Sequence, residues 1–454
     1  MYNKNAWEKY DEKELKLLMD FNEDYKAFIS KGKTERECVN ESITLAEACG
    51  YKDINKVNSL KPGDKVYATN MGKNIALFII GKKSLTDGLR ILGAHIDSPR
   101  IDLKQNPVYE KDGLALFDTH YYGGIKKYQW VTLPLSLHGV VVKKDGTVVN
   151  ISIGDDDNDP VFGITDLLVH LSSDQMQKNA AKVIEGEDLD VLIGSIPLKG
   201  EDKDKVKANV LRLLKEKYDI TEEDFVSAEV EVVPAGAARD FGFDRSLIYG
   251  YGHDDRVCGF TSLRAILDIE NPEYTSCCIL VDKEEVGSIG ATGAHSLFLE
   301  NTILTLLSLE GKNDLLSLRT ALRNTKMLSS DVSAGVDPIY SGVNDSKNAA
   351  YIGHGICFNK YTGSRGKSGC NDANPEYIAW LRQIMDDGLI NYQTAELGRV
   401  DQGGGGTIAY ILGNYTMNVI DAGIAVLNMH APWELVSKAD VYEAYKAYKL
   451  FLLK

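Results

Sequence analysis

Apolar residues recur every three or four positions near the N-terminus and then collect in short, uninterrupted runs. The helical spacing predicts helices over residues 7–31 and 34–49. The apolar runs at 75–80 and 91–94 that follow are typical of buried strands, because a strand covered on both faces has no polar side. This order predicts the opening of an α/β sheet.

The middle of the chain has a different, β-rich pattern. Two runs, 135–142 and 147–153, flank the segment Lys143-Lys144-Asp145-Gly146, whose Asp-Gly pair is a strong signal for a hairpin turn. A charged segment over about 201–218 predicts a helix at the end of this section. The change of pattern indicates a separate β-rich domain.

Strands and helices alternate again from Phe260 onward. The pattern predicts helices near 260–269, 291–300 and 437–452, and strands near 276–282, 350–358 and 422–429. A chain of 454 residues is long enough for two or three domains. We therefore expect an α/β, mixed-sheet domain with helices on both faces, formed by residues 1–101 and 237–454. An inserted β-rich oligomerisation domain at 102–236 would interrupt it.

Composition narrows the class of protein. A formal net charge of −15 argues against nucleic-acid binding, which depends on clustered Lys and Arg. No apolar stretch is long enough to predict a membrane span, and the mixed-charge N-terminus is unlike a secretory signal. That N-terminus predicts a cytoplasmic location by default. The seven cysteines are odd in number and lack a CxxC pair, which predicts reduced thiols.

Metal-binding side chains follow three of the predicted strands. His95, the pair Glu284-Glu285 and His430 each come directly after an apolar run. A single histidine at a strand end is more often structural. The carboxyl ends of strands in an open α/β sheet face one crevice, however, so three such ends favour a shared metal site.

Two aspartates and the adjacent glutamates extend this hypothesis. Asp97 lies two residues after His95, where a carboxylate can orient a metal-bound imidazole. Asp254 has two oxygens and would suit a bridge between cations about 3.5–4 Å apart, although a helix N-cap is the alternative. Of Glu284 and Glu285, one would bind metal and the other would transfer a proton. The pattern predicts a two-metal hydrolase.

Taken jointly, these segments resemble the family of aspartyl aminopeptidase and vacuolar aminopeptidase I, over almost the whole chain. The resemblance rests on residues 93–104, 123–124, 130, 135–140, 166–171, 282–288, 330–332 and 429–430. No single segment would be specific, but the combination is.

The resemblance implies two metal positions that share one aspartate. The ligands would be His95, Asp254 and Asp331 for the first position, and Asp254, Glu285 and His430 for the second. Glu284 would be the general base. Asp97, which would orient the metal-bound imidazole of His95, is the other predicted catalytic residue. His170 would enter the substrate site of a neighbouring subunit, and Tyr377 would contact substrate. The family forms a tetrahedral dodecamer whose active sites face an internal chamber, so a homododecamer is expected.

The predicted function is a metal-dependent aminopeptidase that removes the N-terminal residue of peptides through a hydroxide bridging two divalent cations. Imidazole and carboxylate ligands suit zinc first, with cobalt and manganese as alternatives. Two other functions stay open. One is a carboxypeptidase or amide deacylase with the same metals, and the other is a noncatalytic oligomeric binding protein stabilised by metal.

Several segments depart from the aspartyl enzymes. Residues 253–255 are His-Asp-Asp where those enzymes usually have Leu-Asp-Asn, and a glycine-rich segment at 401–407 replaces a Ser-Pro-Cys-Gly-Ser-Thr type of loop. Lys360, Arg365 and Lys367 would select an acidic first residue, or would form an ordinary exposed basic loop. The sequence therefore leaves open whether the preferred N-terminal residue is acidic or neutral.

Overall fold

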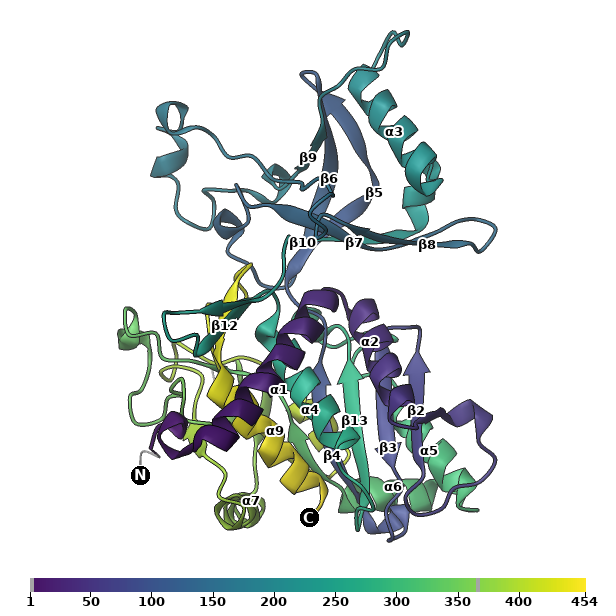
Figure 1. The fold of residues 1–454 in the computed structure, drawn as a ribbon, viewed down its shortest axis with the longest axis vertical. Coiled ribbons are helices and arrows are strands. Elements are labelled where there is room, and N and C mark those ends of the chain that lie inside the picture. Colours follow the sequence, from purple (N-terminus) through teal and green to yellow (C-terminus); the bar gives the residue numbers. More distant parts are fainter. Residues whose placement is uncertain (1–3, 365–367) are drawn as a thin grey trace. The chain divides into compact units, whose positions relative to one another are not determined.

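The chain forms two compact units in a computed structural model that describes residues 4–364 and 368–454 (Figure 1). The first unit contains the chain up to Asp97, together with Ala238–Met429 and Glu434–Lys454. The second unit contains Ser98–Ala237 and the short segment His430–Trp433.

A mixed sheet of nine described strands forms the centre of the first unit. In spatial order the strands are β1 (Lys52–Asp53), β2 (Lys65–Asn70), β3 (Asn74–Ile79), β13 (Thr275–Val281), β4 (Leu89–His95), β14 (Lys326–Ser329), β20 (Asn418–Gly423), β16 (Ile356–Asn359) and β19 (Tyr392–Ala395). The neighbours β13, β4, β14 and β20 run parallel to one another. Their carboxyl ends therefore lie at the same edge of the sheet, as in other open α/β sheets.

Helices cover both faces of this sheet. One layer contains α1 (Glu12–Lys31), α2 (Glu35–Ala48), α4 (His253–Leu267), α7 (Pro375–Asp387) and α9 (Lys438–Leu452). The other contains α5 (Phe298–Leu309), α6 (Leu315–Asn324) and α8 (Ala409–Gly413). Successive strand residues contribute to opposite layers: Leu92 and Cys278 belong to the first, Ile91 and Cys277 to the second. The predicted α/β fold is confirmed.

Local signals explain where two of these helices begin. The Thr34 side chain accepts a hydrogen bond from the Glu37 backbone N–H, and the Glu37 carboxylate accepts one from Thr34, which is a capping box at the start of α2. The Ser437 hydroxyl accepts from the Ala439 N–H at the start of α9. Such caps satisfy backbone donors that the first helical turn leaves without partners.

Two smaller sheets also lie in the described part of the first unit. One has the order β11 (Arg239–Phe241), β12 (Leu247–Gly250), β22 (Glu434–Ser437), β21 (Ala425–Leu427) and β15 (Ser333–Ala334). The other is the hairpin of β17 (Tyr361–Ser364) and β18 (Ser368–Asp372). The former sheet pairs β12 with β22, so the chain just before residues 252–254 is hydrogen-bonded to the C-terminal segment.

The second unit is an antiparallel sheet with one α-helix. Its order is β8 (Val148–Ile153), β7 (Leu135–Val142), β10 (Ala228–Pro234), β5 (Arg100–Lys111), β6 (Leu114–Tyr122) and β9 (Val191–Gly194), and its helix is α3 (Lys205–Tyr218). The Asp145-Gly146 pair lies in the predicted turn between β7 and β8. Trp130 is fully buried.

The helix predicted near 291–300 is misplaced, because α5 begins only at Phe298. Residues 287–297 form turns instead, with positive φ at Gly287 and Gly290. The Thr292 hydroxyl donates to the Asp282 carboxylate at 2.6 Å and folds this loop back onto the end of β13. The apolar residues of this loop are spaced as in a helix, but the glycines turn the chain and prevent a helix from forming.

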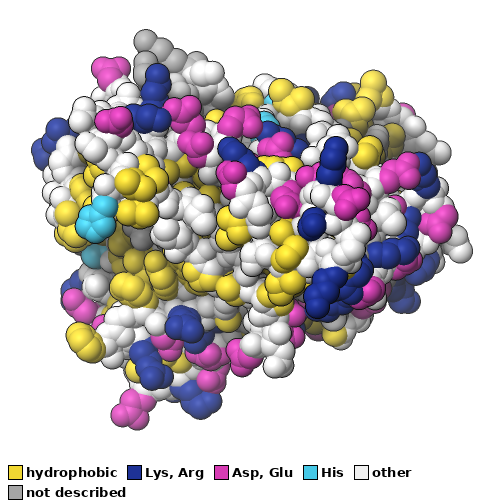
Figure 2. Space-filling model, turned by 90° about the horizontal axis from the view of Figure 1, so that it is seen from above, with side chains coloured by type: hydrophobic (Ala, Val, Ile, Leu, Met, Phe, Trp, Pro, Cys, Tyr) yellow, Lys and Arg dark blue, Asp and Glu magenta, His cyan; other side chains and the backbone are white. Residues whose placement is uncertain are grey.

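The surface mixes both signs of charge. On the face shown in Figure 2, Lys and Arg side chains are interspersed with those of Asp and Glu, and hydrophobic side chains gather between them. None of the helices in the described part of the chain combines the length and hydropathy that a membrane span requires.

Candidate metal centre

His95 is the last residue of β4 and lies at the carboxyl edge of the large sheet. The register pairs it with Val281, the last residue of β13, so these two strand ends are level. The Ile96 N–H donates to the Val281 carbonyl at 2.9 Å and continues the alignment one residue further. The apolar sequence of β4 thus buries the strand and leaves its terminal imidazole at the sheet edge, where it is only 2% exposed.

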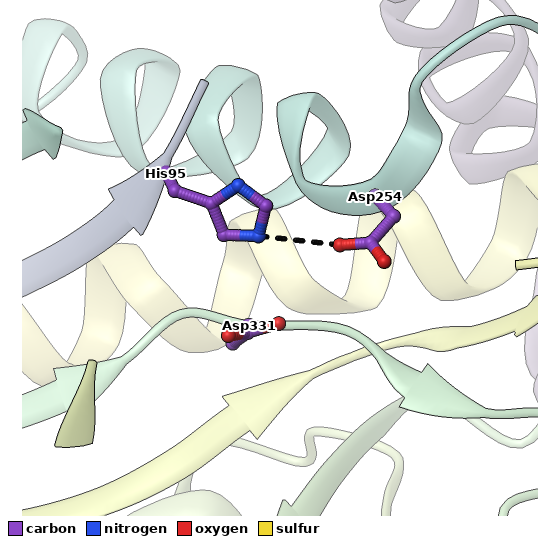
Figure 3. Close-up of side chains that lie close together, drawn as sticks. All are labelled: His95, Asp254 and Asp331. Carbon is purple, nitrogen blue, oxygen red and sulfur yellow. Dashed lines mark ion pairs between the residues drawn. The ribbon is translucent and has the colours of Figure 1, made fainter. Parts of the chain in front are cut away.

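Two aspartates from distant segments lie beside this imidazole, as Figure 3 shows. Asp254 comes from the start of α4, and Asp331 follows β14. His95 Nε2 is 3.2 Å from Asp254 Oδ1, and one ligand atom from each of the three residues lies within 4.8 Å of the others. All three side chains are buried. The structure therefore brings the three ligands predicted for the first metal position together.

The backbone at Asp254 is not helical, with φ −79° and ψ 106°, and its peptide bond to Asp255 is cis. Regular helical geometry begins only at Arg256. The Asp254 carboxylate is directed at His95, which favours the ligand interpretation over the helix N-cap alternative.

Glu284 and Glu285 lie in a short 3-10 turn, Glu284–Val286, directly after β13. Lys283, with φ 70°, turns the chain out of the strand. Ligand atoms of the two glutamates and of His95 lie within 4.8 Å of one another, and Glu284 Oε2 is 4.0 Å from His95 Nε2. Both glutamates are partly exposed. Adjacent carboxylates at this strand end thus reach the same imidazole.

Asp97 connects the two strand ends. Its carboxylate oxygens accept hydrogen bonds from the backbone N–H groups of Glu284 and Glu285, each at 3.1 Å. Its carbonyl oxygen lies 3.1 Å from His95 Nδ1. Because a carbonyl only accepts, His95 Nδ1 donates to it, and Nε2, which faces Asp254, is the ring nitrogen left to bind a metal. Asp97 thus orients both the imidazole and the turn that carries the glutamates.

The charges of the cluster suit a cation. Burial raises the pKa of the Asp331 carboxyl well above its ordinary value, and the Asp255 carboxylate raises it further. Burial alone would lower the pKa of His95, but hydrogen bonds with Asp254 and Asp97 outweigh burial and raise that pKa well above its ordinary value. Buried carboxylates that repel one another are stabilised by a divalent cation, and imidazole with carboxylate is a donor set that zinc accepts. The residues present therefore fit a zinc ion.

Two further predicted site residues, His430 and His170, belong to the second unit. His430 lies in the segment His430–Trp433, which groups with the second unit, and its Nδ1 donates to the Gly124 carbonyl at 2.8 Å. Its predicted place beside Asp254 and Glu285 stays a prediction. His170 is exposed in a 3-10 turn of the second unit, Val169–Leu171.

Tyr377 occupies a different environment from the one predicted. It is 3% exposed, its ring stacks on Trp380, and its hydroxyl donates to the carbonyl of Met327 inside β14. These contacts favour a packing role over the predicted contact with substrate. In the basic loop, Lys360 Nζ donates to the Tyr361 hydroxyl, and Arg365 and Lys367 lie outside the described residues.

Three buried charged residues at the centre received no role from the sequence: Asp255, Arg256 and Glu434. The first two belong to a motif that drew attention only for Asp254. Glu434 carries no local signal, because its partner lies 180 residues away: Glu434 Oε2 accepts from the Asp254 N–H at 3.0 Å. A run of consecutive charges ahead of a predominantly apolar helix was the available sign of buried polar contacts.

Comparison with known proteins gives consistent matches. The model of the family "Aminopeptidase I zinc metalloprotease (M18)" matches residues 28–452. A "Probable M18 family aminopeptidase 1" from Clostridium acetobutylicum is 64% identical over 454 residues, which cover 99% of this chain and 98% of the relative.

Solved structures agree. The crystal structure of an M18-family aminopeptidase from Thermotoga maritima is 46% identical, covers 100% of both chains and has a TM-score of 0.97. The mApe1 dodecamer of S. cerevisiae is similar in fold alone, with 20% identity, 96% of each chain covered and a TM-score of 0.75.

Proposed function

This chain belongs to the M18 family of aminopeptidase I zinc metalloproteases and is a metal-dependent aminopeptidase, and from that premise we propose that catalysis takes place at the cluster around His95. The observation that carries the proposal is the meeting of His95, Asp254 and Asp331 from three separate segments in one buried cluster. Buried groups of this kind are costly without a function or a partner.

Two zinc ions per chain are the proposed cofactors. His95, Asp254 and Asp331 would hold the first, and Asp254, Glu285 and His430 the second. Asp254 has an oxygen for each. When bound, divalent cations supply Lewis acidity, which lets water lose a proton near neutral pH and polarises a carbonyl. Cobalt and manganese accept the same donors and stay alternatives.

Glu284 is proposed as the group that moves the proton. Its carboxylate lies 4.0 Å from His95 and is partly exposed, so water and substrate can reach it. It would accept the proton of the attacking water and pass it to the leaving amine. Asp97 holds the Glu284 N–H and so fixes where this base stands. The substrate is a peptide with a free N-terminus.

Removal and return of metal tests this function. After treatment with a chelator, the protein is expected to lose cleavage of free-amine peptides and to regain it with zinc, cobalt or manganese, because the proposed reaction needs a cation to activate water and polarise the carbonyl. A matched panel of N-blocked peptides should stay intact. Cleavage of the blocked panel would instead indicate a deacylase or carboxypeptidase. Metal binding without cleavage of any peptide would indicate the noncatalytic alternative.

We propose a homododecamer in the cytoplasm, the state that the family resemblance implies and that the S. cerevisiae neighbour of similar fold forms. Exposed apolar side chains around His170 support assembly into a homo-oligomer. Leu168, Val169, Leu171 and Met176 are 54%, 78%, 67% and 72% exposed. Large apolar side chains gathered in this way mark protein interfaces. The light-scattering mass of the purified protein should therefore be about twelve times the 50.1 kDa of one chain. A monomeric mass at all concentrations would contradict assembly.

A further inference from the structure

Three consecutive residues near the start of α4 make hydrogen bonds to other parts of the first unit. They are Asp254, the aspartate proposed to be shared by both metals, and the two residues after it. The contacts are Asp254 N–H to Glu434 Oε2 at 3.0 Å, His95 N–H to Asp255 Oδ2 at 3.4 Å, and Arg256 Nε–H to the Ile96 carbonyl at 3.1 Å. Two of these three contacts end on His95, the last residue of β4, and on Ile96, which directly follows it. The proposed ligand Asp254 is therefore followed by two side chains that hydrogen-bond to the end of the strand carrying His95, the other ligand.

These residues are deeply buried. Asp255 and Arg256 are 0% exposed and Glu434 is 1% exposed. The Arg256 guanidinium also lies over the Tyr251 ring, with its central carbon 5.0 Å from the ring centroid. Charged side chains are rarely buried in this way unless their partners satisfy them, since removal from water is costly. Apolar side chains would fill the same space without the free-energy cost of removing charges from water.

We propose that Asp255 and Arg256 are positioning residues that hold the Asp254 carboxylate in register with His95 and so set the affinity of the first metal position. One contact between α4 and β4 would leave a hinge. Two contacts, to the His95 N–H and the Ile96 carbonyl, fix both the distance and the rotation of the segment. The proposal rests on the proposed metal site, because it concerns the ligands of that site.

Two substitutions of Asp255 distinguish the effect of its hydrogen bond from the effect of its charge. Asparagine has a side-chain oxygen at the same place and can accept from the His95 N–H. Asp255→Asn should therefore keep the contact, whereas Asp255→Ala removes it. Arg256→Lys keeps a positive charge but loses the planar Nε–H donor that reaches Ile96.

The test measures zinc affinity of the full-length protein by competition with a chromophoric chelator, and the visible spectrum of the cobalt-loaded protein. Asp255→Ala and Arg256→Lys are expected to bind zinc about 10- to 100-fold more weakly, the usual effect of removing a group that orients a ligand. Their cobalt spectra should shift. Asp255→Asn should rescue both properties to within a few-fold of wild type.

Asp440→Ala is the matched control. Asp440 is also a fully buried aspartate of the first unit, and its carboxylate accepts from the N–H groups of Gly353 and Gly355, both at 2.7 Å. Its removal should lower the melting temperature and leave zinc affinity and the cobalt spectrum unchanged. Equal loss of affinity in this control would overturn the proposal, since the effect would then be general destabilisation.

The remaining outcomes are also decisive. Wild-type protein that binds no zinc would reject the proposed function itself. Wild-type binding with unchanged affinity in Asp255→Ala would reject only the positioning role. A loss in Asp255→Asn as large as that in Asp255→Ala would contradict the hydrogen-bond basis. If Asp255→Ala does not fold, Arg256→Lys decides, and wild-type affinity in that variant would reject the proposal.

Discussion

Glu284→Gln is expected to keep its bound metal and to lose about 10²- to 10⁴-fold in kcat, the range that a positioned general base contributes. Glutamine has nearly the same shape and can keep the backbone contact with Asp97, because that contact uses the N–H of residue 284. It cannot accept a proton from water near neutral pH. The loss should therefore appear in turnover and not in metal content.

Steady-state kinetics and elemental analysis of the same preparation check this prediction. Glu376→Gln is the matched control, since Glu376 is an exposed glutamate in the first turn of α7. It should behave as wild type in both measurements. A Glu284→Gln protein with ordinary turnover would assign the base to another group, and one that loses its metal would make Glu284 a ligand.

Asp254→Asn is expected to weaken zinc binding at both positions by more than about 100-fold, beyond the loss caused by changing an outer-shell group. The reason is that Asp254 is the one residue common to both proposed ligand sets, and asparagine offers a single neutral oxygen in place of two charged ones. Peptidase activity should disappear with the metal.

Glu285→Ala provides the comparison for Asp254→Asn. Glu285 belongs only to the second proposed set, so its variant should retain the zinc held by His95, Asp254 and Asp331. Titration with zinc, followed by elemental analysis of each variant, distinguishes the two patterns. Full occupancy in Asp254→Asn, or identical losses in both variants, would contradict the sharing of Asp254.

The part of the site that was predictable from sequence is the part encoded by strand ends. Uninterrupted apolar runs identify β4 and β13, and parallel strands bring their carboxyl ends to one edge whatever their order in the sheet. His95 and Glu284 could therefore be expected near each other before the sheet order was known. The register of β4 and β13 supports this argument, since Val281 pairs with His95.

What could not be predicted depends on contacts between distant residues or on loop geometry. Glu434 meets the Asp254 N–H across 180 residues, and no local pattern encodes that meeting. Tyr377 has the periodicity of an amphipathic helix, which is the same for a core residue and for one facing a ligand. The start of α5 was misplaced because positive-φ glycines at 287 and 290 turn a stretch whose apolar spacing is helical.

The alternation of side chains along β13 restricts how this segment can change in length. The side chains of Cys277 and Cys278 pack into opposite helical layers, and Glu284 lies in the short turn that follows the strand. A single-residue insertion between Thr275 and Val281 would exchange the two layers or displace the carboxylates from the imidazole. Gain or loss of residues during divergence should thus be confined to surface segments such as 311–314, and this strand should keep a constant length.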